Sequence, residues 1–195
     1  SVRRDIKKNL IQNLNFLSKT KSVFLDRDGV INKEKNKKKN LKNFRILPKV
    51  RKAIKKLNEN KIPCFIVSNQ AGLAKGEFSS IDLLKIISQL DKHLSKNGAY
   101  INDFLICPHF KDKKYKFINQ SFFSDFRKPD PGMIIDLAKK YKICLKKSFI
   151  IGDSDIDILA GKRAKLKTIL VESPKIKAYK FKVKPNLKVM DLKSA

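Results

Sequence analysis

The stretch VFLDRDGVIN, residues 23–32, places Asp26 and Asp28 directly after a short apolar run. Short runs of β-branched, aromatic and leucine residues are typical of buried strands in parallel sheets. Ligands of open parallel sheets bind beyond the carboxyl ends of the strands. The stretch therefore predicts a buried strand that ends in two acidic groups at a candidate site.

The rest of the chain alternates apolar runs typical of strands with segments whose apolar residues recur at helical spacing. We expect strands within residues 21–26, 62–70, 101–108, 147–153, 167–173 and 186–192, and helices within 47–61, 79–98, 155–165 and from 130 onward. This order predicts an α/β protein, a Rossmann-like three-layer sandwich with a mostly parallel central sheet.

Composition bounds the class of protein. The chain of 195 residues is long enough for one well-buried domain, and it carries a net charge of +28. Only seven of its 46 basic residues are arginine, and it is rich in Asn, Ile and Phe. We favour the codon usage of an AT-rich genome as the cause of the charge, with nucleic acid as the alternative partner.

Membrane and disulfide signals are weak in this sequence. No apolar run approaches the ~20 residues that span a bilayer, so we expect no membrane partner. The 3 cysteines are odd in number and widely spaced, which argues against a disulfide framework and favours a reducing, cytoplasmic location.

The first twenty residues form a separate segment in this interpretation. Ile6, Leu10, Leu14 and Leu17 recur at helical spacing, so residues 1–20 are expected to form an amphipathic helix or linker ahead of a domain at 21–195. Such a helix could dock a partner or join the domain to a longer polypeptide.

Polar residues follow three of the expected strands: Asp26 and Asp28 the first, Ser68 and Asn69 the second, and Asp153 the fourth. The carboxyl ends of parallel strands meet at one edge of a sheet, so these side chains should lie close together. Converging carboxylates repel one another unless a cation lies among them, and oxygen ligands suit Mg²⁺. We therefore expect a magnesium site at this edge.

The same residues have the chemistry for phosphoryl transfer. Asp26 can attack phosphorus and form an aspartyl-phosphate, while Asp28 protonates the leaving alcohol and later accepts a proton from water. Ser68 and Asn69 offer donors to phosphoryl oxygens, and Lys128 of the FRKPDPG loop offers a fixed positive charge.

Four segments, DRDGVIN, VSNQAGLAKG, FRKPDPGM and IGDSDIDILAG, resemble in this order the motifs of haloacid dehalogenase (HAD) superfamily phosphatases. The match extends over residues 22–175 and is closest to the branch of heptose-bisphosphate and histidinol-phosphate phosphatases. The motif residues SNQAGLAKG and RKPDPGM favour the heptose enzymes within that branch. The resemblance implies a capless, Mg²⁺-dependent phosphatase that acts on a small phosphorylated sugar. It also implies that Asp26 is the nucleophile, that Asp28 is the acid/base, and that Ser68 and Lys128 hold the phosphoryl group. The metal ligands it implies are Asp26, Asp153 and the backbone carbonyl of Asp28.

Two features of the sequence depart from the heptose-type pattern. Cys107 and His109 match half of a structural zinc site, but Ser124 and Phe126 occupy the positions of the second ligand pair. Tetrahedral structural zinc needs four nitrogen or sulfur ligands, so we expect no zinc and a loop held by packing, with Phe126 in place of the metal.

The second departure concerns the substrate: residues 36–38, Asn-Lys-Lys, stand where heptose-type members have Gly-Tyr-Val, and Lys75 stands where they have Arg. We expect Asn69 and Gln70 to contact the substrate, and Lys75 and Arg127 to bind a second anionic group. Two alternatives stay open. One is a phosphatase for histidinol phosphate or nucleic-acid ends, and the other is a non-catalytic module of the HAD fold, against which the presence of Asp28 argues.

Overall fold

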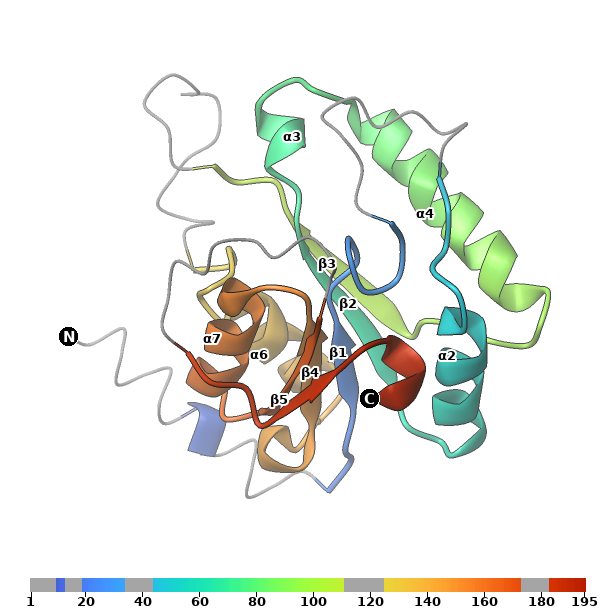
Figure 1. Ribbon diagram of the computed structural model, residues 1–195. Coiled ribbons are helices and arrows are strands. Elements are labelled where there is room, and N and C mark those ends of the chain that lie inside the picture. Colours follow the sequence, from blue (N-terminus) through green and yellow to red (C-terminus); the bar gives the residue numbers. More distant parts are fainter. Residues whose placement is uncertain (1–9, 13–18, 34–43, 111–124, 173–182) are drawn as a thin grey trace.

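The computed structural model describes residues 10–12, 19–33, 44–110, 125–172 and 183–195. Six strands form one parallel sheet in the order β3-β2-β1-β4-β5-β6 (Figure 1). Their bounds are β1 Val23–Leu25, β2 Cys64–Asn69, β3 Asp103–Cys107, β4 Phe149–Gly152, β5 Lys167–Val171 and β6 Leu187–Val189. The expected parallel sheet is thus confirmed, with shorter strands than the apolar runs suggested.

Helices cover both faces of this sheet, as expected for a three-layer sandwich (Figure 1). The helices are α2 Val50–Glu59, α3 Ala71–Ala74, α4 Ser80–Ser95, α6 Gly132–Lys140 and α7 Asp155–Arg163, with 3₁₀ turns η2 Leu145–Lys147 and η3 Leu192–Ser194. Helix α4 begins with a capping box in which Ser79 and Asp82 bond each other's backbone N–H. Helix α3 was not expected, because its four residues are too few for a periodic pattern.

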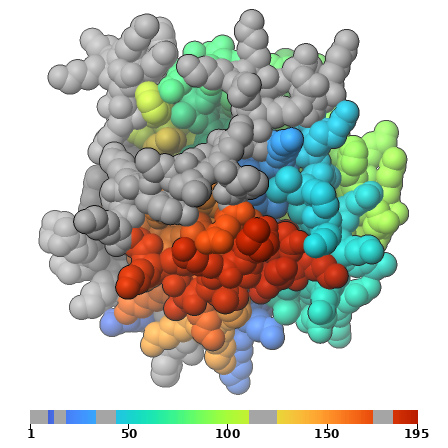
Figure 2. All heavy atoms as spheres, in the orientation of Figure 1, coloured from blue at the N-terminus to red at the C-terminus, as the bar shows by residue number. Residues whose placement is uncertain are grey.

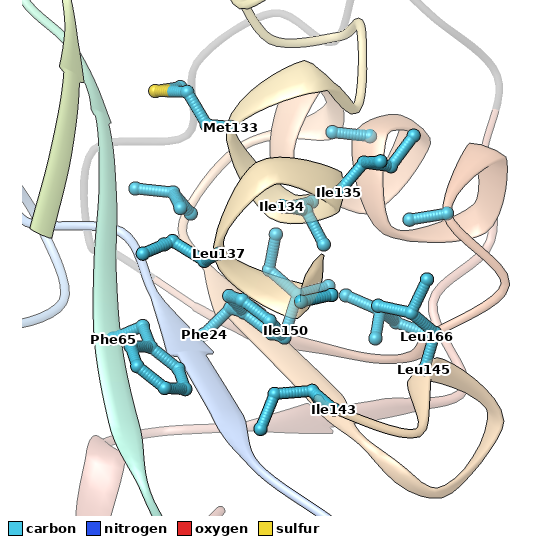
Figure 3. Packing of buried hydrophobic residues seen from close by; sticks show 14 of the residues in the cluster. Phe24, Phe65, Met133, Ile134, Ile135, Leu137, Ile143, Leu145, Ile150 and Leu166 are labelled. Atoms are coloured by element: carbon cyan, nitrogen blue, oxygen red, sulfur yellow. The ribbon is translucent and has the colours of Figure 1, made fainter. Parts of the chain in front are cut away.

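Alternation along the strands divides the core into two clusters. Phe24, Phe65 and Ile150 point to the face covered by α6 and α7, where Figure 3 shows them facing Leu137 and Ile134. Their strand neighbours point to the opposite face and pack against α2 and α4. Since both faces are buried, the strands are apolar throughout.

The strand order places the end of β1 at the centre of one sheet edge. The chain runs from β1 outward to β2 and β3, and then returns to β4 on the other side of β1. Leu25 is paired with Ile66 of β2 and with Ile151 of β4. Asp26 therefore emerges between two strand ends, at the point where the direction of winding reverses and ligands of such folds bind.

The described residues nearest the two ends of the chain belong to different parts of the core. Ile11 is 4% exposed and belongs to the core cluster beneath α6. Most of the expected N-terminal helix, at 1–9 and 13–18, lies outside the described residues, so the boundary at residue 20 stays a prediction. At the other end, the C-terminal residues, red in Figure 2, lie beside α2. Asp191 there pairs with Lys49 at 2.8 Å.

Within the described ranges, no helix has the length and apolar character that a bilayer crossing requires.

Candidate active site

A buried lysine lies at the centre of the candidate site. Lys128 is 3% exposed, and its ammonium group lies 2.8 Å from Asp26 Oδ1 and 2.6 Å from Asp157 Oδ1. It also donates to the backbone oxygen of Val67 at 2.7 Å. Burial alone lowers the pKa of Lys128, but the two carboxylates outweigh this effect and hold its pKa above the ordinary value. The lysine is therefore a fixed positive charge.

The loop that carries Lys128 is fastened to the end of β2 by its backbone. The Asn69 side chain accepts from the Lys128 N–H at 3.0 Å and donates to the Lys128 carbonyl at 2.9 Å. We expected Asn69 to contact substrate; in the structure its amide is engaged with this loop. The side chain thus sets the position of Lys128, and a substrate contact stays a prediction.

Asp26 directly follows β1 and is 9% exposed. Burial raises the pKa of its carboxyl to about 7; Lys128 lowers this pKa, whereas the neighbouring charge of Asp157 raises it. A divalent cation would add positive charge and favour the ionised carboxylate.

Three carboxylates gather at this edge. Asp26, Asp153 and Asp157 each place an oxygen within 4.8 Å of the others. The one buried lysine among them balances only part of their charge, and hard oxygen donors at this spacing fit a small divalent cation such as Mg²⁺. The donor set therefore fits the expected metal, and both Asp26 and Asp153, two of the expected ligands, belong to it.

Asp157 is the functional residue that we did not anticipate. It lies in the first turn of α7, is 1% exposed, and is engaged on both oxygens, one by Lys128 and the other by the Ser154 hydroxyl. The four-residue spacing from Asp153 in GDSDID was the available signal. An aspartate in the first turn of a helix is so common that the spacing alone did not distinguish it.

Among the described residues, the side chains of Arg27, Gln70 and Asn32 donate to Asp28. Its Oδ2 accepts from Arg27 at 2.7 Å and from Gln70 at 2.8 Å, and its Oδ1 accepts from Asn32 at 2.8 Å. The Gln70 amide also donates to the Ser68 hydroxyl at 2.8 Å. Ser68 and Gln70 are therefore both joined to the acid/base candidate, and Gln70, at 2% exposed, is directed inward.

The two candidates for a second anionic group lie together. The Lys75 ammonium is 3.9 Å from the centroid of the Phe110 ring, and the Arg127 guanidinium carbon is 5.7 Å from it. Arg127 also donates to the backbone carbonyl of His109 at 2.8 Å. Two cations thus share one aromatic ring, between the end of β3 and the loop that carries Lys128.

The half zinc motif is buried beside this ring. Cys107 and His109 are 1% and 2% exposed, and burial raises the pKa of the Cys107 thiol. Neither belongs to a group of three or more potential metal ligands in the described part of the chain. Phe126 packs against the core, while Ser124 lies outside the described residues.

Gly29 makes room for the metal candidates. Its φ is +92°, and a Cβ there would lie 2.0 Å from Asp153 Oδ2. The turn after β1 can therefore approach Asp153 only without a side chain.

Comparison with known proteins agrees with this geometry. A family model described as HAD-hydrolase-like matches residues 125–195. The D-glycero-alpha-D-manno-heptose-1,7-bisphosphate 7-phosphatase of Photorhabdus laumondii is 37% identical over 147 residues, 75% of this chain and 79% of the relative. The D-glycero-beta-D-manno-heptose-1,7-bisphosphate 7-phosphatase of Rhodopseudomonas palustris is 38% identical over 143 residues, 73% of this chain and 78% of the relative.

A solved structure extends the likeness over more of the chain. It is D,D-heptose 1,7-bisphosphate phosphatase from B. bronchiseptica complexed with magnesium and phosphate, with a TM-score of 0.78 and 27% identity. The match covers 90% of this chain and 95% of that one.

The parallel sheet and the carboxylates at its strand ends define a hydrolase of the HAD type, as the motifs indicated. Within that class, the chain belongs to the family of heptose-1,7-bisphosphate 7-phosphatases.

Two glycine substitutions separate backbone strain from the metal site. Gly98 has a φ of +67°, and a Cβ there would meet nothing within 4 Å. We expect G98A to lower the free energy of unfolding by roughly 1–2 kcal/mol, the cost of a side chain at positive φ, and G29A to lower it by more, because its Cβ also clashes with Asp153. Only G29A should also weaken Mg²⁺ binding, by about tenfold or more, because it displaces Asp153. Titration calorimetry with Mg²⁺ measures the difference, and equal affinities in both variants would contradict the assignment of Asp153.

Proposed function

We propose that the protein is a Mg²⁺-dependent phosphatase that removes the C7 phosphate of D-glycero-D-manno-heptose 1,7-bisphosphate through an aspartyl-phosphate. The observation that carries the proposal is the setting of Asp26, which lies 2.8 Å from a buried lysine and within 4.8 Å of two further carboxylates. The names of the relatives, which include both anomers of this substrate, support the sugar.

Asp26 is the nucleophile in this proposal. Its carboxylate oxygen bonds to phosphorus as the bond from phosphorus to the sugar oxygen breaks, and water then hydrolyses the aspartyl-phosphate. Lys128 lies beside the attacking carboxylate, where it stabilises phosphoryl oxygens as charge develops on them. Ser68, at the end of β2, offers a hydroxyl to the same oxygens.

Asp26, Asp153 and the backbone carbonyl of Asp28 would hold the Mg²⁺. The ion supplies positive charge that offsets the repulsion between the nucleophile and a phosphate dianion. Asp157 has both oxygens engaged by Lys128 and Ser154, so we assign it to holding the lysine.

Asp28 exchanges the protons. It gives a proton to the leaving sugar oxygen and later takes one from the attacking water. Its three donors, Arg27, Asn32 and Gln70, keep the carboxyl in one orientation.

Lys75 and Arg127 bind the phosphate at C1 in this proposal. Both cations lie near the Phe110 ring, and Arg127 directly precedes the catalytic lysine, Lys128, in the chain. A bisphosphate can therefore be held at both ends. We also place the reaction in the cytoplasm, since the three free, buried thiols fit a reducing compartment.

Replacement of the nucleophile tests the reaction. We expect D26N to lower Mg²⁺-dependent phosphate release from heptose 1,7-bisphosphate by at least about 10³-fold, since an amide cannot form the phospho-enzyme. Its circular dichroism should match the wild type. D136N, on the exposed face of α6, serves as the control and should retain full activity. Wild-type turnover by D26N would refute the assignment of Asp26.

A comparison of two substrates tests the second anion site. We expect K75M to raise KM for heptose 1,7-bisphosphate by about tenfold, the value of one charged hydrogen bond, with little change for heptose 7-phosphate. K85M removes the charge of an exposed lysine in α4 and controls for the effect of net charge on substrate binding. An equal rise in KM for both substrates, or none, would place the C1 phosphate elsewhere.

A further inference from the structure

Arg27 is a buried cation between two catalytic candidates. It separates Asp26 from Asp28 in the sequence, yet it is 2% exposed. Its Nη2 lies 2.7 Å from Asp28 Oδ2, while its Nε and Nη1 have no hydrogen-bond partner among the described residues. Asp28 is thus the one ionic partner of this guanidinium within the described part of the chain.

Burial of Arg27 is unfavourable for stability alone. Moving a guanidinium out of water is strongly unfavourable, and one ion pair that leaves Nε and Nη1 without hydrogen bonds offsets this cost poorly. An apolar side chain would fill the same space at lower cost. The contact to Asp28 is therefore the feature that the arginine adds at this position.

The arginine side chain borders a pocket on the α4 side of the sheet. The pocket has a volume of about 380 Å³, with Ile66, Leu90 and Leu94 among its apolar lining residues. The metal candidates lie at the sheet edge instead, where Asp26 and Asp153 meet. Ser88 and Asp91 line the same pocket, but the described ion pair of Arg27 is with Asp28.

The backbone of Arg27 supports the same geometry. Its carbonyl accepts from Ile31 N–H at 2.9 Å and from Asn32 N–H at 3.1 Å, which closes the turn that carries Asp28. The Asn32 side chain then donates to Asp28 Oδ1. The side chain of Arg27 and its backbone carbonyl thus both help to position Asp28.

We propose that Arg27 is a positioning residue that fixes the Asp28 carboxyl for proton transfer to the leaving alcohol. The proposal rests on the proposed phosphatase function. Arg27 and Gln70 both donate to Oδ2, which keeps that oxygen an acceptor. Oδ1 accepts from Asn32, whose amide also donates to the carbonyl of Lys33, so we assign the proton to be transferred to Oδ1.

Bonds and protons balance in the first step, the transfer of the phosphoryl group to Asp26. The bond from Asp26 Oδ to phosphorus forms, the bond from phosphorus to the sugar oxygen breaks, and the Asp28 proton moves to that oxygen to give the alcohol. Asp28 is left as a carboxylate that pairs with Arg27. A leaving group that is stable as an anion needs no such proton.

The dependence on leaving group tests this role. We expect R27M to lower kcat/KM for heptose 1,7-bisphosphate by about 10²-fold, the usual contribution of a general acid. For p-nitrophenyl phosphate, whose nitrophenolate leaves unprotonated, the loss should stay below about tenfold. R51M, on the exposed face of α2, controls for the loss of one arginine and should match the wild type on both substrates.

Two further variants connect the effect to Asp28. In a D28N background, R27M should cause no additional loss, because the group through which it acts is gone. R27K keeps the charge without the planar fork, so it should restore part of the activity on the sugar substrate. If R27M does not fold by circular dichroism, R27K in both backgrounds supplies the same comparison.

The outcomes separate this proposal from the proposed function. A wild-type protein without Mg²⁺-dependent activity on either substrate would refute the phosphatase assignment. If the wild type is active, two results would overturn only the role of Arg27. One is an equal loss of kcat/KM on both substrates in R27M, and the other is a further loss of kcat/KM when R27M is added to D28N.

Discussion

The structure depends on one buried ammonium group that holds two carboxylates together. Lys128 lies 2.8 Å from Asp26 and 2.6 Å from Asp157, and it is only 3% exposed. Without this charge, two acidic groups could not be buried at the meeting point of β1 and α7. The lysine is carried by a loop that Asn69 fastens to the end of β2. The ammonium nitrogen of Lys128 therefore joins its own loop to β1, β2 and α7. The site is complete only when these four segments have packed together.

Sequence patterns were informative where the physics is local. Apolar runs such as residues 64–67 predicted the strands, and apolar residues at helical spacing within 79–98 predicted α4. The acidic ends of β1 and β4 predicted the edge at which the site lies, because parallel strands all end there.

Contacts between distant segments could not be predicted in the same way. Asp157 has the local pattern of any first-turn aspartate, and only the tertiary fold brings it to Lys128. The Gln70 amide donates to Asp28 and Ser68, a pairing across the site that the sequence did not indicate, and its contact with substrate stays a prediction. The order of the strands and the shared ring of Phe110 likewise depend on packing that no single segment encodes.

The most direct measurement is a crystal structure grown with Mg²⁺ and beryllium fluoride, which mimics a phosphoryl group bound to aspartate. One metal ion should lie between Asp26 and Asp153, with the fluoride adduct on Asp26 and the Lys128 ammonium against its fluorines. A metal ion bound away from Asp26, or an adduct on another carboxylate, would contradict the central role given to this cluster.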